Sequence, residues 1–230
     1  PTYHELAQKL DGDRFHERPW RADNSHYLPW GGFTVLRDRP QAYALLDAGP
    51  VGTAHAHFDA QQVLIKSSDQ WLISDPGKPR YDGSAVSQHL KSAAGHNVVL
   101  MDDQLHQPTP AVARASESFP IAYSFERPVQ FAASQRSAQL IESSAHAFTH
   151  ERTLLSIKQV GWIVFDRLRP FDEESHDWHW LWHSPVDQIR TQDSRACGYY
   201  DGQQESFLML MAGGSPVETA VRCGEYEERC

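Results

Sequence analysis

The chain has 230 residues, of which 40% are hydrophobic and 22% charged, as expected for a globular domain with one sizeable core. Its formal net charge is −9 and no basic stripe offsets it, which argues against a nucleic-acid-binding surface. No apolar run reaches the roughly 18–20 residues that a membrane helix requires. The negative charge would also repel a polyanionic sugar at long range, unless basic groups are gathered locally.

The first 30 residues differ in pattern from the rest of the chain. Residues 3–10 carry apolar side chains at the spacing of one helix face, and Asp11 and Gly12 end that pattern. The stretch that follows is polar and contains proline and tryptophan. We therefore expect residues 1–30 to be a helical and irregular lead-in segment, and residues 31–230 to form a separate β domain.

From residue 31 onward, short β-prone runs alternate with turn residues. The runs recur at intervals of roughly 8–15 residues, and no long helical period separates them. This spacing predicts an all-β fold, an antiparallel sandwich or jelly roll. The expected strands are 33–36, 42–46, 62–65, 71–73, 97–101, 139–141, 153–157, 162–166, 178–183 and 207–211.

The 13 histidines are the most unusual feature of the composition. On an extended strand His55, His57 and Asp59 would share one face, because successive side chains alternate. Two imidazoles and a carboxylate can converge on a divalent cation such as zinc. Asp75 ends the run that returns antiparallel after a short turn, which makes it a candidate third ligand. His96 follows small residues that allow the backbone to approach closely.

Structural histidines are the alternative to a metal site. A single histidine in a β domain more often makes a structural hydrogen bond than a metal bond. Several titratable groups buried without a partner would be costly, which favours a metal, and the residue pattern leaves both interpretations open. For His176, His179 and His183 we expect solvent-facing positions, with the neighbouring tryptophans packed in the core.

Several short motifs, taken in order, resemble the C-terminal domain of heparinase II/III-like lyases. The small-small-His-Asn motif at 93–97 is one of them, and the likeness spans about residues 30–185. The motifs lie at 46–50, 55–60, 72–77, 81–83, 92–99, 102–104, 150–153, 161–167 and 176–185.

Members of that family join an N-terminal helical toroid to a C-terminal β-sandwich and cleave uronate-containing polysaccharides by β-elimination. The resemblance implies that His57, Asp75 and His96 hold a divalent metal, for which this ligand set favours zinc. It implies that His55 faces the cleft as a catalytic residue and that Tyr81 is the catalytic tyrosine of the sandwich. Asp59 would then hold an imidazole in the right tautomer rather than bind the metal.

The resemblance also implies an acidic polysaccharide as substrate and a periplasmic or secreted bacterial location. The helical toroid, with the family's carboxylate-neutralising residue and its principal catalytic tyrosine, is not in these residues. Residues 1–30 would be its trailing end. Related sandwiches continue beyond the point where Cys230 ends this chain. We therefore expect activity only in a longer protein, and none from this chain alone.

Two other functions fit parts of the pattern. One is a non-catalytic carbohydrate-binding or structural β module with a stabilising metal site. The other is a cupin-type metal enzyme, which also uses an HxH pair but prefers a glutamate some residues further on, whereas Asp59 follows His57 by only two. The three cysteines, Cys197, Cys223 and Cys230, are too few for a disulfide scaffold. One disulfide, from Cys197 to Cys223 or Cys230, could form in an oxidising compartment, and the sequence does not decide this.

Overall fold

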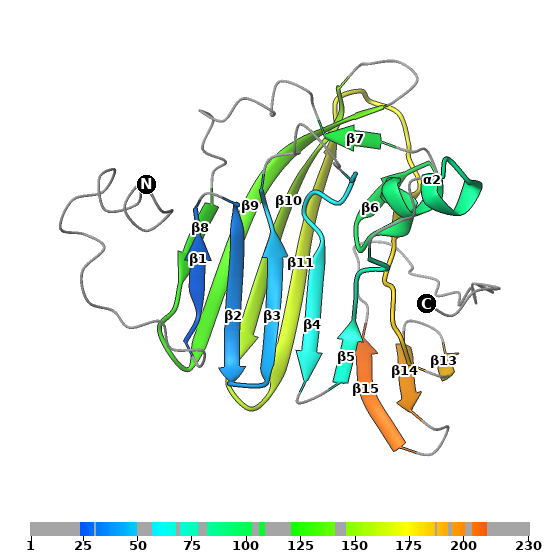
Figure 1. The fold of residues 1–230 in the computed structure, drawn as a ribbon. Coiled ribbons are helices and arrows are strands. Elements are labelled where there is room, and N and C mark those ends of the chain that lie inside the picture. The colour runs from blue at the N-terminus through cyan, green and yellow to red at the C-terminus, as the bar shows by residue number, and fades with distance from the viewer. Residues whose placement is uncertain are drawn as a thin grey trace, which may run out of the picture.

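The computed structural model describes most of the chain from residue 24 to residue 210 (Figure 1). Among these residues no helix is long and apolar enough to cross a bilayer. The described residues are 24–29, 31–49, 57–67, 70–77, 82–102, 106–108, 121–140, 146–186, 188–192, 195–200 and 204–210.

Strands dominate the described chain. The helical elements are α2 (Ala85–Lys91) and the 3-10 turn η2 (Ala93–Gly95). The strands are β1 (His26–Leu28), β2 (Phe33–Arg39), β3 (Ala42–Asp47), β4 (Val63–Ser67), β5 (Gln70–Ile73), β6 (Val99–Met101), β7 (His106–Pro108), β8 (Ile121–Ser124), β9 (Val129–Leu140), β10 (His146–Ile157), β11 (Gly161–Pro170), β12 (Trp178–Trp180), β13 (Gln188–Gln192), β14 (Arg195–Tyr200) and β15 (Gln204–Leu210).

Two five-stranded antiparallel sheets form the sandwich. The first has the order β1-β2-β3-β4-β5, and the second has the order β11-β10-β9-β7, with β8 also paired to β9. Figure 1 shows the first sheet in front of the second, with the β2–β3 and β10–β11 turns at one end and α2 near the other. Smaller sheets pair β6 with β12 and join β13, β14 and β15. The predicted all-β antiparallel sandwich is confirmed.

The core lies between the two main sheets. Every second residue of β2 and β3 is buried along most of their length, as a strand with one face toward a core requires. The buried cluster joins side chains of the first sheet to side chains of the second. Its members are Leu36, Ala44, Leu46 and Val63 from β2, β3 and β4, and Ala132 and Leu154 from β9 and β10.

Several strands of the structure match the expected positions, but β7, β8, β13, β14 and α2 were not predicted, and β9 was predicted only in part. The run 139–141 predicted only the end of β9, because the rest of that strand is rich in alanine, serine and glutamine rather than β-branched residues. Pairing with β10 along nearly its whole length holds β9 in the sheet. Helix α2 was not predicted either, although Ser84 caps it by accepting a hydrogen bond from the Ser87 amide at 3.2 Å.

The lead-in range contains one strand of the sandwich. β1 lies inside residues 1–30 and pairs antiparallel with β2. The helix expected at 3–10 lies outside the described residues, and the division at residue 30 stays a prediction.

Candidate metal centre

Residues 57–59 of the histidine motif lie in a loop and not on a strand. Residues 57–62 connect toward β4 without strand pairing, so the prediction that His57 and Asp59 lie on a strand is wrong. The loop is anchored near both ends, because the Phe58 amide donates to Lys91 O at 2.9 Å and the Gln61 amide donates to Asp47 O at 2.7 Å. Phe58 also packs against the buried cluster that includes Val98.

His96 is delivered by the close packing of η2 on α2. A Cβ atom on Gly95 would lie 2.7 Å from His89 O and 3.2 Å from Leu90 Cα, so a larger residue there would push the two segments apart. The predicted close approach at these small residues is confirmed. The next residue, His96, is completely buried.

Two imidazoles and a carboxylate meet at this point. One ligand atom from each of His57, Asp59 and His96 lies within 4.8 Å of the others, and the two rings are 5.2 Å apart between centroids. These residues form a His/Asp group that could hold a metal ion. Asp75, the predicted third ligand, reaches the group through His96, since His96 Nδ1 and Asp75 Oδ2 are 2.8 Å apart.

The second nitrogen of His96 is available for a metal. His96 Nε2 is buried and has no hydrogen-bond partner among the described residues. If Nδ1 donates a hydrogen bond to Asp75, then Nε2 carries a lone pair that no described protein group satisfies. A buried acceptor of this kind is costly unless a donor or a cation fills the space beside it. The residues present therefore fit a divalent metal.

The electrostatics of the group favour neutral imidazole at His57. Burial, followed by the neighbouring His96, lowers the pKa of His57, while burial raises the pKa of Asp59. Burial acts to raise the pKa of Asp75 as well, but hydrogen bonds from His96 and from the Gly77 amide outweigh it and lower that pKa. Neutral histidine is the form that binds metals.

Two buried charges that the sequence analysis did not single out lie next to this group. Burial, reinforced by the charge of Asp59, raises the pKa of Asp47 to about 7. Burial lowers the pKa of Arg136 to about 10, and its Nη2 donates to Ala48 O at 2.9 Å and also to Gly49 O. Arg136 lies in the middle of β9, where no local pattern marks it as different from a surface arginine.

Asn97 connects three segments around the centre. Its Nδ2 donates to Val63 O at 3.1 Å and Ser74 O at 3.0 Å, and its Oδ1 accepts from the His183 amide at 2.6 Å. Asn97 is completely buried. Asn97 therefore serves to hold these backbone segments together.

Arg152 supports both loops that carry the group. Its Nη1 donates to Gln61 O and to Asn97 O, each at 2.8 Å. Gln61 lies two residues after Asp59, and Asn97 directly follows His96. Arg152 is completely buried. In the sequence, Arg152 is marked only by its place in the motif at 150–153.

The other predicted residues are placed as follows. The two candidate catalytic residues, His55 and Tyr81, lie outside the described residues. His183 is half-buried beside Asn97, with its Nδ1 3.2 Å from Asn97 Oδ1, so it faces the protein and not the solvent. His176 lies between two carboxylates, with Nδ1 2.7 Å from Asp102 Oδ2 and Nε2 2.7 Å from Asp172 Oδ1.

The contact of His176 predicts a pH-dependent contribution to stability. The hydrogen bonds to Asp172 and Asp102 raise the pKa of His176 to about 9, and its side chain is only 7% exposed. A raised histidine pKa stabilises the fold fully below about pH 6.5 and loses that effect as the pH rises through about 9. Hence the Tm difference between the wild type and His176→Ala should be largest near pH 6 and should fall as the pH rises through about 9, to the smaller value that the neutral ring's packing on Trp178 leaves. Thermal melts across this range measure it, and a difference that does not change with pH would contradict it.

The comparisons with known proteins agree with the fold and the motifs. The family model described as "Heparinase II/III-like, C-terminal" matches residues 21–227. A heparinase III structure is similar with a TM-score of 0.62 and 17% identity, over 79% of this chain and 28% of that one. The heparan sulfate lyase HepC from Pedobacter heparinus is similar with a TM-score of 0.63 and 16% identity, over 81% of this chain and 28% of that one.

The chain thus spans between a quarter and a third of the length of these solved structures. The search of curated proteins found no significant match. At this level of identity the solved structures support the sandwich fold, while the family model covers nearly the whole chain. The chain belongs to the heparinase II/III-like family, whose C-terminal β-sandwich domain it forms.

Proposed function

We propose that this chain is the C-terminal sandwich of a polysaccharide lyase that cleaves a uronate-containing polysaccharide by β-elimination. The observation that carries the proposal is the partly buried His/Asp group in a domain of this family, with the Nε2 atom of the buried His96 left without a partner among the described residues. The metal-stabilised but non-catalytic β module remains the alternative that the experiments below separate from it.

The proposed metal ligands are His57, Asp75 and His96, with zinc as the metal. A specific observation favours Asp59 as the carboxylate ligand instead, because Asp59 and not Asp75 belongs to the group within 4.8 Å. In that arrangement Asp75 would orient His96 through Nδ1 and leave Nε2 for the metal. In either arrangement the ion, when bound, would neutralise the clustered carboxylates and order the loops that carry them.

β-Elimination at a uronate needs three functions from the protein. A base removes the C5 proton, a polar group stabilises the developing negative charge on the carboxylate, and an acid protonates the leaving glycosidic oxygen. We propose that His55 and Tyr81 act in proton transfer or substrate binding at the sandwich side of the cleft. The remaining groups would come from a helical domain of the same protein, and the location would be periplasmic or extracellular.

Substitution of the two motif histidines tests the proposal in the full-length protein. His57→Ala should lose metal and lower the Tm, because it removes a ligand. His55→Ala should keep the metal and lower kcat by about 10²–10⁴, the usual contribution of a general acid or base. Metal content by mass spectrometry and the ultraviolet absorbance of unsaturated uronate measure the two effects.

Each alternative outcome has a distinct meaning. Equal metal loss from both variants would contradict the division of roles and would fit a cupin-like site. If His57→Ala loses metal and the wild-type protein forms no unsaturated uronate, the non-catalytic module is supported. This chain by itself is expected to bind metal without turnover, and an absorbance rise from it alone would contradict the dependence on a second domain.

A further inference from the structure

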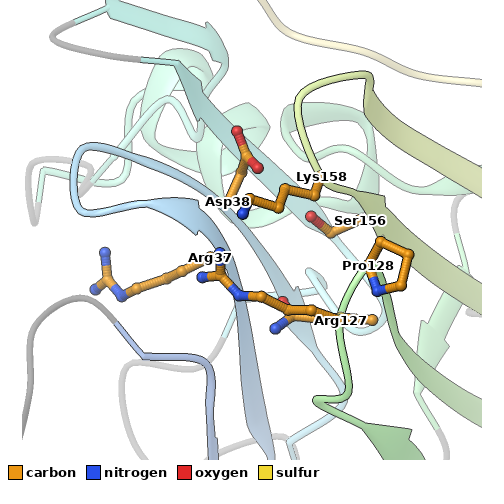
Figure 2. A pocket seen from close by; sticks show the side chains of 7 residues that line it. Arg37, Asp38, Arg127, Pro128, Ser156 and Lys158 are labelled. Carbon is orange, nitrogen blue, oxygen red and sulfur yellow. The ribbon is translucent and has the colours of Figure 1, made fainter.

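The end of the sandwich away from α2 gathers positive charge. Three turns meet there: the β2–β3 turn, the segment between β8 and β9, and the β10–β11 turn (Figure 1). Arg37, Arg127 and Lys158 line one shallow depression between them (Figure 2). We call these three residues the basic end cluster. It lies within a chain whose formal net charge is −9.

Backbone contacts hold the cluster in place, not ion pairs. The Lys158 amide donates to Pro128 O at 3.0 Å, and the Gln159 amide donates to Asp38 Oδ1 at 3.0 Å. These bonds tie the β10–β11 turn to the other two turns. The cations therefore stand on a preformed frame, which reduces the entropy lost when a ligand binds.

The protein provides little negative charge to this cluster. Asp38, the one carboxylate that lines the depression, already accepts from Gln159, and its Oδ2 lies 3.4 Å from Arg39 Nε. Within the described part of the chain, no carboxylate is recorded at ion-pair distance from Arg127 or Lys158. The acidic residue nearest to Arg127 along the chain is Glu126, which is exposed.

Arg37 adds a buried donor without an acceptor. Its Nη1 donates to Pro40 O at 3.0 Å, and its guanidinium carbon lies 4.8 Å from the centre of the Tyr43 ring. Its Nε, however, is buried and has no hydrogen-bond partner among the described residues. A buried donor without an acceptor is costly, and an oxyanion beside it would remove that cost.

We propose that the basic end cluster binds a sulfate or carboxylate group of the acidic polysaccharide, as an accessory subsite away from the metal centre. Guanidinium forks and an ammonium group match such oxyanions. The positive charge of the cluster also offsets locally the long-range repulsion between a polyanion and a protein with a net charge of −9. The identity of the polymer rests on the proposed function, whereas the preference for an oxyanion rests on the cluster itself.

Calorimetric binding of a sulfated uronate oligosaccharide to the full-length protein tests the proposal. Arg127→Gln/Lys158→Gln should weaken binding at least tenfold and should reduce the dependence of the affinity on salt. The matched control is Arg167→Gln/Arg169→Gln, which also removes two exposed positive charges, but at residues already paired with Glu151 at 3.8 Å and 3.6 Å. The control should change the affinity less than twofold. The affinity for a neutral oligosaccharide should be the same in the wild type and in both double variants.

An equal loss of affinity in both double variants would overturn the proposal, because it would show a general charge effect. Wild-type affinity in Arg127→Gln/Lys158→Gln would overturn it too. Turnover measured separately distinguishes this failure from failure of the proposed function. If unsaturated uronate forms and the affinity does not depend on the cluster, only the accessory subsite is wrong. If binding depends on the cluster while no turnover occurs, only the proposed lyase activity is wrong.

Discussion

Replacing Asp166 with alanine should lower the free energy of unfolding by about 3–5 kcal/mol, because it leaves the Arg152 guanidinium buried without a counter-charge. Arg152 Nε donates to Asp166 Oδ1 at 2.7 Å, and Nη2 donates to Oδ2 at 3.0 Å. Trp180 Nε1 also donates to Oδ2, at 2.9 Å, and His150 Nε2 lies 2.7 Å from Oδ1. Although burial acts to raise the pKa of Asp166, Arg152 and His150 hold it well below its usual range.

Urea denaturation followed by tryptophan fluorescence measures this effect. The matched control is Glu151→Gln on the same sheet, because Glu151 is one-third exposed and its arginine partners lie at 3.6–3.8 Å. An exposed pair of this kind contributes less than about 1 kcal/mol. If Asp166→Ala lowered the free energy of unfolding no more than Glu151→Gln does, the buried pair of Arg152 and Asp166 would not be a main support of the fold.

The same variant should also weaken metal binding. Arg152 Nη1 holds the carbonyl oxygens of Gln61 and Asn97, which lie next to the two loops of the metal centre. If the guanidinium shifts, the separation of His57, Asp59 and His96 is no longer defined. A residue that acts through others in this way typically changes metal affinity by about 10–100-fold.

Replacing His96 with alanine should lower zinc affinity by more than about 100-fold, which exceeds the usual effect of an outer partner. His96 is completely buried and contributes to every arrangement that the centre allows. Competition with a chromophoric chelator measures the affinity, and circular dichroism checks that the variant folds. His179→Ala, on β12, is the matched histidine control and should leave the affinity within twofold. Unchanged affinity in His96→Ala would contradict the metal centre.

The pair Asp59→Asn and Asp75→Asn identifies the carboxylate ligand. The variant that removes the ligand should match the loss of His96→Ala, and the other should lose about 10–100-fold as an outer partner. Cobalt substitution adds an independent measurement, because the visible spectrum changes when an oxygen donor leaves the ion. Equal and small losses in both variants would mean that neither carboxylate contacts the metal.

Local sequence patterns predicted much of the fold. The short spacing of β-prone runs between turn residues was enough to indicate a sandwich. The alternating burial in β2 and β3 agrees with it, because each strand must turn one face to a core. Such patterns failed at β9, whose polar and alanine-rich residues take strand form through pairing with their neighbours. They also failed at residues 57–62, where a period of two occurred in a loop.

What the sequence determined by itself is the sandwich and the family, because the spacing of apolar runs and the order of motifs are local properties. The metal-binding role of His57, Asp75 and His96 stays a prediction. The tertiary structure alone decided which groups meet. It placed Asp59 beside His57 and His96, and put Asp75 on His96 Nδ1.

The tertiary structure also buried Arg152 under both loops of the centre and collected cations at the far end. These contacts join residues that are far apart in the sequence, such as Arg152 and Gln61 at a separation of 91. They depend on how two sheets pack face to face, and no short stretch of sequence carries that information.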